Sequence, residues 1–437
     1  MCIKQMIYNT PENLPLRELE IWLSGDLSVN IEPAVKLTRV YFDSFDWRLL
    51  RSGSVFEASF KEGRYLLTWR ELLTGKVLIS RMMRKVPRFA RDFKASGLRA
   101  QLQAVLGERT LLPQVSVNSN TQTLSLQNAD QKTLVRVELR QDNVLAPKTT
   151  DRFKLPTQIH LFPLRGYESL CKKQLQQLTV KGRLETITED PLITALNYLQ
   201  IKPGQYSNQP DVQLTRDQAA HQALSSILRG FLQILKQNLE GACQDKDPEF
   251  LHDFLTAVRR IQCLLNRFSE VFPAQQIGLI QQDFIWIEQI ATPVRNIDIY
   301  LGLYDDFAAR LDREHRTALR SLHQYLKELK NKQQRQMRVS LESPRCSRLI
   351  TLFEQFLEQN LSDRQTSPAA TEPILELANA SIAGLYRELR DQGQEIAITD
   401  QTDDLLELHQ ICKRLGYQME IFRGLYSAKK IAPLIAH

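Results

Sequence analysis

Two stretches of the sequence carry the same helical pattern. Residues 251–272 read LHDFLTAVRRIQCLLNRFSEVF, and residues 405–426 read LLELHQICKRLGYQMEIFRGLY. Apolar side chains recur in both at steps of four and three, which is the spacing of one buried face of a helix. Each apolar position of the second stretch lies 154 residues after its counterpart, so that Phe254, Val258, Ile261, Leu265, Phe268 and Phe272 correspond to Leu408, Cys412, Leu415, Met419, Phe422 and Tyr426. The chain therefore contains an internal repeat of a core-facing helix.

A basic doublet occupies the same phase of both stretches: Arg259–Arg260 in the first and Lys413–Arg414 in the second. If the duplicated helices face each other across a pseudo-two-fold axis, these four cations line one central groove. A basic pair at the solvated edge of an amphipathic helix is the competing interpretation. The matched phase favours the groove, but both interpretations stay open on the sequence alone.

The region around the repeat predicts an all-α domain. A linker rich in Pro, Gly, Asn and Gln occupies residues 201–215, and a helical period follows from residue 216 to residue 430. A polar break at residues 362–373 divides the helices into two groups. The predicted helices cover residues 216–239, 249–271, 276–291, 295–309, 311–339, 343–361, 371–391 and 402–426. Long antiparallel helices with short connections are typical of bundles.

A second basic cluster lies on the predicted helix 311–339. At 100° per residue, its basic side chains form one stripe nearly opposite the leucines of the same helix, and the stripe contains no acid. Guanidinium groups in such a stripe can each bind two phosphate oxygens. The stripe consists of Arg313, Arg316, Arg320, Lys327 and Arg338.

Residues 1–200 predict an α+β domain. Short alternating or β-branched segments such as KLTRVYFDSF, SVFEASF and TLVRVEL are separated by turn residues, and helical stretches interrupt them near residues 94–106 and 166–178. Several strands with helices at the periphery favour an antiparallel sheet or barrel.

Charge and composition limit the classes of function. The formal net charge of +7 suggests an anionic partner, but the excess is uneven. Lys and Arg outnumber Asp and Glu by 30 to 20 in residues 1–202, and are outnumbered by 30 to 27 in residues 203–437. A polyanion site in the helical part must therefore come from local clustering of cations. The six cysteines show no metal-ligand spacing, and no apolar run is long enough to cross a membrane. We expect a cytoplasmic protein with reduced thiols, no metal and no cofactor.

The helical part resembles the CHAD family, the conserved histidine α-helical domain of bacteria and archaea. DPEFLHDFLTAVRR resembles the family pattern DxExxHxxRVxxRR, and ATPVRNIDIYLGLYDDF resembles LGxxRDxDVxL. SPRCSRLITLFEQFL is similar to SxRYxxLLxxxxxFL, and CKRLGYQMEIF to KRLRYxxEhF. The four stretches together cover about residues 217–430, and as a set they are far more specific than any one of them.

The resemblance implies a fold of two four-helix bundles with pseudo-two-fold symmetry around a basic channel, and binding of inorganic polyphosphate. Carried over position by position, it implies polyphosphate-binding roles for Arg259, Arg260, Arg295, Arg338, Arg345, Lys413 and Arg414. His252 matches the residue for which the family is named; we interpret it as a cap or brace of its helix, with ligand contact as the alternative. Tyr417 matches the tyrosine of the last motif. Cations expected from the family are absent at Leu255, Gln262, His409 and Gly416, which weakens the expected polyphosphate site.

The N-terminal part resembles the CYTH fold, the triphosphate-tunnel family that is often joined to CHAD. RVYFDSFDWRLLRSG, residues 39–53, resembles YFDTxxxxLxxxG. The family's catalytic ExExK would fall on Glu18, Glu20 and Trp22, and its LRxR on residues 55–58, where both arginines are absent. Metal-assisted phosphoryl chemistry needs carboxylates and phosphate clamp together, so this resemblance implies a degenerate domain without catalytic residues.

One further run, RMMRKVPRFARDFK at residues 81–94, mixes six basic residues with Phe89 and Phe93. Nucleic-acid binding is one interpretation, and a solvated loop is the favoured one, because no nucleic-acid-binding motif surrounds the run.

The sequence thus predicts a non-catalytic protein that binds inorganic polyphosphate or another polyanion in a basic groove and associates with polyphosphate granules, without a membrane partner. Two other hypotheses stay open: a triphosphate or polyphosphate hydrolase working through the N-terminal domain, and a scaffold that has lost polyphosphate binding.

Overall fold

The computed structural model divides the chain into two compact units, Met1–Tyr206 and Ser207–His437. The division falls within the predicted linker. The residues that the structure describes are 6–10, 16–24, 27–61, 63–93, 97–145, 152–164, 166–182, 184–186, 189–362, 367–399 and 402–435.

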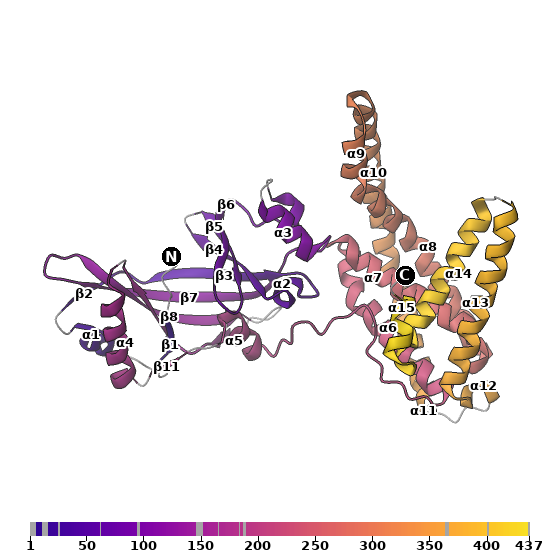
Figure 1. Cartoon of the computed structure of the whole chain (residues 1–437), viewed down its shortest axis with the longest axis horizontal. Helices are drawn as coiled ribbons and strands as arrows, with labels where there is room; N and C mark the ends of the chain where they lie inside the picture. The colour runs from indigo at the N-terminus through magenta and orange to yellow at the C-terminus, as the bar shows by residue number, and fades with distance from the viewer. Residues whose placement is uncertain are drawn as a thin grey trace. The chain divides into compact units, whose positions relative to one another are not determined.

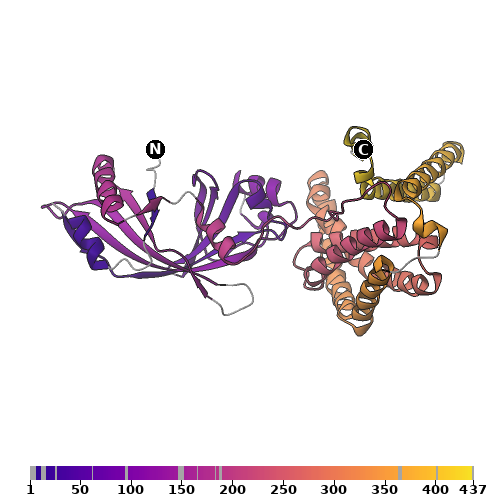
Figure 2. The ribbon, with the colours of Figure 1, turned by 90° about the horizontal axis from the view of Figure 1, so that it is seen from below.

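The first unit is built on one antiparallel sheet, as predicted (Figures 1 and 2). Its strands run in the order β11-β1-β10-β8-β7-β3-β4-β5-β6, with β2 paired to β7 and β9 to β8. The strands are β1 (Met6–Asn9), β2 (Ser28–Ile31), β3 (Val35–Asp43), β4 (Ser54–Lys61), β5 (Arg64–Glu71), β6 (Val77–Met83), β7 (Leu112–Gln127), β8 (Thr133–Leu145), β9 (Arg152–Lys154), β10 (Gln158–Pro163) and β11 (Glu185–Thr186).

Helices cover the apolar surfaces of this sheet. At one end, α1 (Leu16–Ser24) and α4 (Glu168–Gly182) pack on buried aliphatic side chains of β7, β8 and β10 (Figure 1). At the other end, α3 (Gly97–Leu106) packs on β4 and β5. The short α5 (Pro191–Tyr198) covers the valines of β4, β7 and β8 on the opposite face. Side chains alternate between the two faces along each strand, so the strands can bury an apolar row on one side and carry polar groups on the other.

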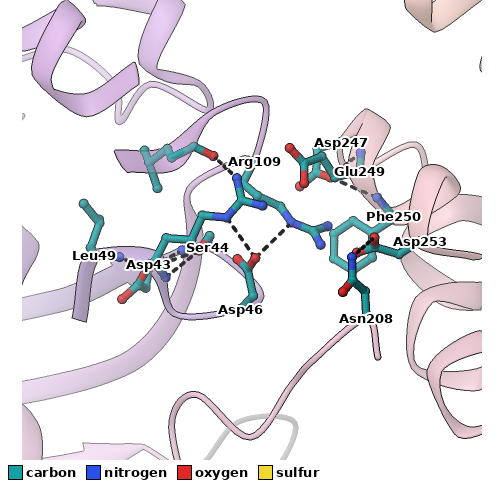
Figure 3. A network of polar contacts seen from close by, with 12 residues as sticks. Asp43, Ser44, Asp46, Leu49, Arg109, Asn208, Asp247, Glu249, Phe250 and Asp253 are labelled. Carbon is teal, nitrogen blue, oxygen red and sulfur yellow. Dashed lines mark hydrogen bonds and ion pairs between the residues drawn. The ribbon is translucent and has the colours of Figure 1, made fainter. Parts of the chain in front are cut away.

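The turn after β3 is held by a buried carboxylate. Asp43 accepts hydrogen bonds from the backbone N–H groups of Ser44, Leu49 and Leu50, which fixes the start of α2 (Arg48–Arg51) (Figure 3). Burial raises the pKa of Asp43 to about 6, although these three hydrogen bonds act in the opposite direction. Residues 41–47, YFDSFDW, therefore form the end of β3 and the turn that leads into α2.

The second unit is all-helical, as predicted. Its first group holds α6 (Ala220–Cys243), α7 (Pro248–Arg267), α8 (Ala274–Gly302), α9 (Tyr304–Arg310), α10 (Arg313–Leu341) and α11 (Pro344–Ser362). After the short α12 (Pro368–Thr371), its second group holds α13 (Ile374–Thr399), α14 (Thr402–Ile421) and α15 (Ala428–Ile435). In Figure 1, α9 and the adjoining part of α10 extend away from the other helices of this unit.

One helix boundary was predicted wrongly. Two helices were expected at 276–291 and 295–309, on either side of Pro293. The structure has one continuous helix, α8, with Pro293 inside it, and the break comes only after Gly302. A proline removes one hydrogen bond of a helix, and here Ala291, Val294 and Ile297 are buried on both sides of it. Burial of the apolar face outweighs the local cost of the proline.

The internal repeat is confirmed over more than the two helices that revealed it. The starts of α13, α14 and α15 lie 154 residues after the starts of α6, α7 and α8. Ala219 and Pro373, which are also 154 residues apart, form an antiparallel bridge. Two hydrogen bonds flank it symmetrically, from Ala220 N to Glu372 O and from Ile374 N to Gln218 O, each at 2.9 Å. The helical unit therefore has a pseudo-two-fold axis that passes through this bridge.

The axis also relates two buried aromatic rings. Phe268, after the end of α7, and Phe422, after the end of α14, meet edge to face with centroids 5.9 Å apart. Edge-to-face aromatic pairs add stabilisation beyond their buried area. The C-terminal ends of the two duplicated helices are thus in contact.

Candidate functional site

Arg260 joins the two duplicated helices. Its guanidinium donates hydrogen bonds to a carboxylate oxygen of Glu420 on α14 and to the carbonyl of Asn208, the latter at 3.1 Å. The side chain is only 7% exposed, and it lies over the rings of Phe231 and Tyr417 at 5.6 and 5.3 Å from the centroids. Its Nε is buried and has no hydrogen-bond partner among the described residues. One cation of the predicted groove is thus placed between α7 and α14.

A pocket opens beside this arginine. Residues 209–214 form one wall, and Gly230 lets this segment lie on α6, because a Cβ there would be 2.3 Å from Cβ of Pro210. The rest of the pocket is lined by Ile227, Phe231, Arg260, Glu420, Ile421, Arg423 and Gly424. The pocket lining holds two arginines, Arg260 and Arg423, and two carboxylates, Glu420 and Asp211, so its formal charge is balanced.

One cation of the second doublet, Arg414, reaches the same junction from α14. Arg414 is exposed and donates to Glu388 on α13 at 3.1 Å, and Lys413 is exposed with no carboxylate partner in the described part of the chain. Burial raises the pKa of the Cys263 thiol on α7, while a hydrogen bond from Gln418 and the charges of Arg414 and Arg267 oppose the rise. Arg414 therefore lies close enough to α7 to act on its thiol.

Arg259 turns away from this junction. Its Nε donates to Glu288 on α8 at 2.7 Å, and its Nη2 to Thr292 at 3.3 Å. The sequence indicated four cations around one groove, and the structure gives three of them a carboxylate partner, leaving Lys413. The groove is therefore less positive than the doublets alone predicted, since Glu288, Glu388 and Glu420 neutralise three of its cations.

The other predicted cations lie in the first helix group. Arg345 donates to Asp283 at 2.7 Å and stacks over Trp286 at 4.2 Å, and Arg338 pairs with Glu342 at 2.9 Å on its own helix. Arg295 is half-buried near Asp298. Burial raises the pKa of Asp298, against the opposing charges of Lys330, 2.7 Å away, and Arg295. The acids that these arginines face, Asp283, Asp298 and Glu342, lie on α8 or at the end of α10 and not on α14.

His252 does not cap its helix. Asp247 is the N-cap of α7 and accepts from the backbone N–H groups of Glu249 and Phe250 at 3.0 and 3.2 Å (Figure 3). The exposed His252 lies beyond the first turn of α7, so the predicted capping role belongs to the aspartate. Tyr417 lies beneath the Arg260 guanidinium.

The four positions that lack a family cation differ in their surroundings. Leu255 is buried in the core of the first group, whereas His409 is exposed on α14. Gln262 and Gly416 are half-buried. A cationic side chain at position 255 would lie in the apolar core, so the leucine that stands there fits the packing of the first group.

Two further cations belong to the junction and were missed by the sequence analysis. Arg267 donates to Ser381 on α13 at 2.8 Å, and Arg423 lines the pocket beside Arg260. A signal for Arg267 was available, because it follows Arg260 by seven residues and thus lies on the same face of α7. Arg423 follows the end of α14, where helical periodicity gives no guidance.

In the N-terminal unit, the proposed alignment of the ExExK motif is wrong. Glu18, Glu20 and Trp22 lie on the helix α1, not on a strand. Residues two apart on a helix point about 200° apart, so the two carboxylates cannot hold one metal ion. Trp22 packs against the buried cluster under α1. Within the described residues, no group of three or more His, Cys, Asp or Glu side chains is arranged to hold a metal.

The polar face of the sheet instead carries paired charges. Arg39 on β3 pairs with Asp142 on β8 at 2.7 Å and donates to Ser119 at 3.0 Å. Arg70 on β5 pairs with Asp190, and Arg140 pairs with Glu138 at 3.2 Å along β8. Charges that neutralise one another inside a sheet hold the strands together and leave little net charge for a ligand.

Four basic residues of the run at residues 81–94 are exposed, namely Arg81, Arg84, Lys85 and Arg88, but its aromatic residues are not free to stack on bases. Phe93 is buried in the core under α3, so it cannot stack on a nucleic-acid base. Arg91 lies over the ring of Phe89 at 4.2 Å and pairs with Glu108 at 2.5 Å. Lys94 lies outside the described residues.

The buried His160 gives the N-terminal unit a pH dependence. Burial lowers the pKa of His160 to about 2, helped by the charges of Arg140 and Arg39. An unfolded histidine titrates near 6.5, so below that pH the unfolded chain binds a proton that the folded chain does not. The contribution of the neutral His160 to the free energy of unfolding is therefore fully present above about pH 6.5. It is lost as the pH falls towards 2, by about 2 kcal/mol between pH 6.5 and 5.

The measurement is urea unfolding of the wild type and of His160→Gln at pH 7 and pH 5. The variant is expected to lose about 2 kcal/mol less than the wild type on acidification. The comparison removes the contribution of Asp43, whose raised pKa acts in the opposite direction over the same range. Equal losses in the two proteins would show that His160 is not the responsible group.

The comparisons with known proteins agree with the helical part of this description. The sequence model of the family described as CHAD domain matches residues 226–437. Residues 226–437 therefore match the CHAD family, as their motifs implied. None of the helices in the described residues is both long and apolar enough to span a membrane.

Among solved structures, the chain is similar to a CHAD domain from the plant Ricinus communis, at 22% identity over 53% of this chain and 74% of that one, with a TM-score of 0.45. It is also similar to a candidate adenylate cyclase from Bacillus halodurans, at 12% identity over 44% of this chain and 98% of that one, with a TM-score of 0.27. A candidate adenylyl cyclase from Hippeastrum, described as having a dominant triphosphatase activity, matches at 11% identity over 46% of this chain and 99% of that one, with a TM-score of 0.29. No match to a curated protein was found.

Proposed function

We propose that the CHAD domain of this chain binds inorganic polyphosphate, or a polyanion of similar charge density, at the junction of α7 and α14. The observation that carries the proposal is the meeting of cations from the two duplicated helices, with Arg260 bound to Glu420 of α14 and Arg414 acting on Cys263 of α7. Four cationic side chains, Arg260, Arg267, Arg414 and Arg423, lie at this junction or line its pocket, against the carboxylates Asp211, Glu388 and Glu420. Lys413 is exposed next to Arg414 in the sequence of α14.

The exposed and the buried cations take different parts in this function. Lys413 and Arg414 are exposed, so they can contact phosphates of a polymer directly. Arg260 is nearly enclosed and paired, so it acts as a positioning residue that holds α14 against α7. Arg259 is partly exposed but is turned towards α8, where it pairs with Glu288, so it lies outside the contacts proposed at the junction.

The carboxylate partners of the cations favour a long polyanion over a single phosphate group. A polyphosphate that binds Arg414 competes with Glu388 for the same guanidinium. A phosphate group offers two oxygens to a guanidinium and carries neighbours that bind the next cation, so a long polymer can outcompete an isolated carboxylate where a single phosphate cannot. The proposed ligand is therefore a long chain, and residence of the protein on cytoplasmic polyphosphate granules follows from the same contacts.

The test is a titration of labelled long-chain polyphosphate at about 50 and about 300 mM salt. Binding by several phosphate contacts releases counterions, so the affinity should fall by at least about a hundredfold between these conditions. Tripolyphosphate should compete weakly, and single-stranded DNA and heparin serve as polyanions of other geometry. Absence of binding at low salt, or binding that does not respond to salt, would overturn the proposal.

We also propose that the N-terminal unit has no triphosphatase activity. The carboxylates of the expected motif diverge on α1, and Arg39, Arg70 and Arg140 are each engaged by a carboxylate on the sheet or beside it. We expect no phosphate release from tripolyphosphate or ATP with Mg²⁺ or Mn²⁺ above the background without protein. A release rate that the double variant Glu18→Gln/Glu20→Gln abolishes would contradict this expectation.

A further inference from the structure

The sheet of the N-terminal unit ends in strands of very different length. One end is β11, which has two residues, whereas the other end is β6, which has seven, Val77–Met83. Within the described residues, β6 pairs with β5 alone. In an antiparallel strand, alternate residues direct their N–H and C=O groups away from the paired neighbour. The outer edge of β6 therefore presents a row of backbone donors and acceptors that a further strand can bind.

One face of β6 packs on the core of this unit. Ile79 and Met83 contact the buried cluster under α3. Side chains alternate along a strand, so Arg81 belongs to the same face, and Leu78 and Met82 belong to the other. Arg81 is exposed, and Leu78 and Met82 are 38% and 46% exposed. A strand added beside β6 would thus meet a cation on one face and two apolar side chains on the other.

The chain at this edge is basic. Residues 77–90 contain no Asp or Glu, and the side chains of Arg84, Lys85 and Arg88 after the strand are exposed, as is Arg81 within it. Cations on an edge strand oppose its pairing with a second copy, because antiparallel pairing of two copies brings like charges close together. The same charges attract an acidic strand.

We propose that β6 binds an extended segment of a partner protein as an added strand, and that this segment is acidic at every second residue and apolar at the others. Main-chain hydrogen bonds to β6 supply affinity, and the alternating side chains supply specificity. The acidic row lies towards Arg81, and the apolar row lies towards Leu78 and Met82. Nucleic acid is disfavoured at these cations, because Phe93 is buried and a guanidinium lies 4.2 Å from the ring centroid of Phe89.

Binding of a labelled octapeptide of alternating valine and glutamate to the full chain tests the proposal. An octapeptide that alternates valine and lysine keeps the apolar row, and one that alternates glycine and glutamate keeps the acidic row. Each of these controls should bind at least about tenfold more weakly, because both rows contact β6. Hydrogen exchange followed by mass spectrometry should become slower over residues 77–83 when the valine–glutamate peptide is bound.

Charge reversal at the edge tests the acidic row. Arg81→Glu/Lys85→Glu should weaken binding of the valine–glutamate peptide at least about tenfold, whereas Lys172→Glu/Lys173→Glu on α4 should change the Kd less than about threefold. The two double variants change the net charge equally, and all four side chains are exposed. Circular dichroism melting shows whether each variant is folded. Arg84→Glu/Lys85→Glu, which changes residues beyond the strand, takes the place of the first variant if that variant does not fold.

The proposal is overturned if the valine–glutamate peptide does not bind at about 1 mM, if the glycine–glutamate peptide binds equally well, or if exchange slows elsewhere and not over residues 77–83. Tighter binding of a single-stranded DNA oligonucleotide, lost in Arg81→Glu/Lys85→Glu, would assign the cations to nucleic acid instead. Exchange over residues 77–83 that slows with the concentration of the chain alone would assign the edge to a second copy. None of these measurements depends on polyphosphate binding, because β6 belongs to the other compact unit.

Discussion

Replacing Lys413 and Arg414 together with alanine should weaken the binding of long-chain polyphosphate by about ten- to a hundredfold at low salt. Both side chains are exposed on α14, with Arg414 at the junction and Lys413 next to it in the sequence, and each charge-assisted contact contributes about 1 kcal/mol or more. The measurement is the same labelled-polymer titration at about 50 mM salt. The double variant should remain folded, because neither side chain is buried.

A matched control separates a site from a general charge effect. Lys172 and Lys173 form an equally exposed basic doublet on α4, in the other compact unit. Changing them to alanine removes the same net charge and should alter the affinity less than threefold, roughly 0.6 kcal/mol. Equal losses in the two double variants would mean that net charge, and not the α7–α14 junction, holds the polymer.

Replacing Asp142 with alanine should destabilise the N-terminal unit by about 3–5 kcal/mol, because it leaves the guanidinium of Arg39 buried without its counter-charge. Both side chains are almost completely enclosed, so water cannot replace the lost carboxylate. Urea unfolding followed by tryptophan fluorescence measures the change. Glu108→Ala, which breaks the exposed pair with Arg91, is the control and should cost less than about 1 kcal/mol.

A second variant tests the reason for that loss. Changing Arg39 to methionine together with Asp142 to leucine removes both buried charges, and should recover a large part of the stability that Asp142→Ala loses. A double variant as unstable as Asp142→Ala would show that packing at this position, and not the uncompensated charge, explains the effect.

The sequence predicted the helical unit well because the spacing of its apolar residues identifies the helices. Apolar steps of four and three locate a helix, and their recurrence 154 residues later locates its duplicate. The same offset separates the two residues of the Ala219–Pro373 bridge and those of the Phe268–Phe422 contact. No local sequence pattern predicts either of these contacts. The predicted break between residues 291 and 295 was wrong, because α8 continues through Pro293 with buried residues on both sides of it.

The composition of the site could be predicted only in part. Arg260 and Arg414 were found from the phase of the doublets, which is a property of each helix alone. Their partners Glu420 and Glu388, and the partner Glu288 of Arg259, depend on how helices pack against one another. A cation whose carboxylate partner comes from a neighbouring helix therefore looks available in the sequence when it is paired in the fold.

In the N-terminal unit the error was a local one. The ExExK motif of a strand was aligned with residues 18–22, whose apolar neighbours have helical spacing. Leu16, Leu19 and Leu23 follow helical spacing, and this pattern indicates a helix over Glu18 and Glu20. Attention to that period would have prevented the alignment of a strand motif there. The charged face of the sheet, with Arg39, Arg70 and Arg140, comes from distant strands and could be recognised only from their pairing.

The slope of log K against log salt concentration tests the central claim most directly, because it counts the phosphate contacts and does not merely record a loss of affinity. For single-stranded nucleic acids each contact contributes about 0.7 to the slope, and polyphosphate should behave similarly. Removing Lys413 and Arg414 should therefore make the slope shallower by about 1.4. A double variant that binds more weakly with an unchanged slope would contradict direct contact between these side chains and the polymer.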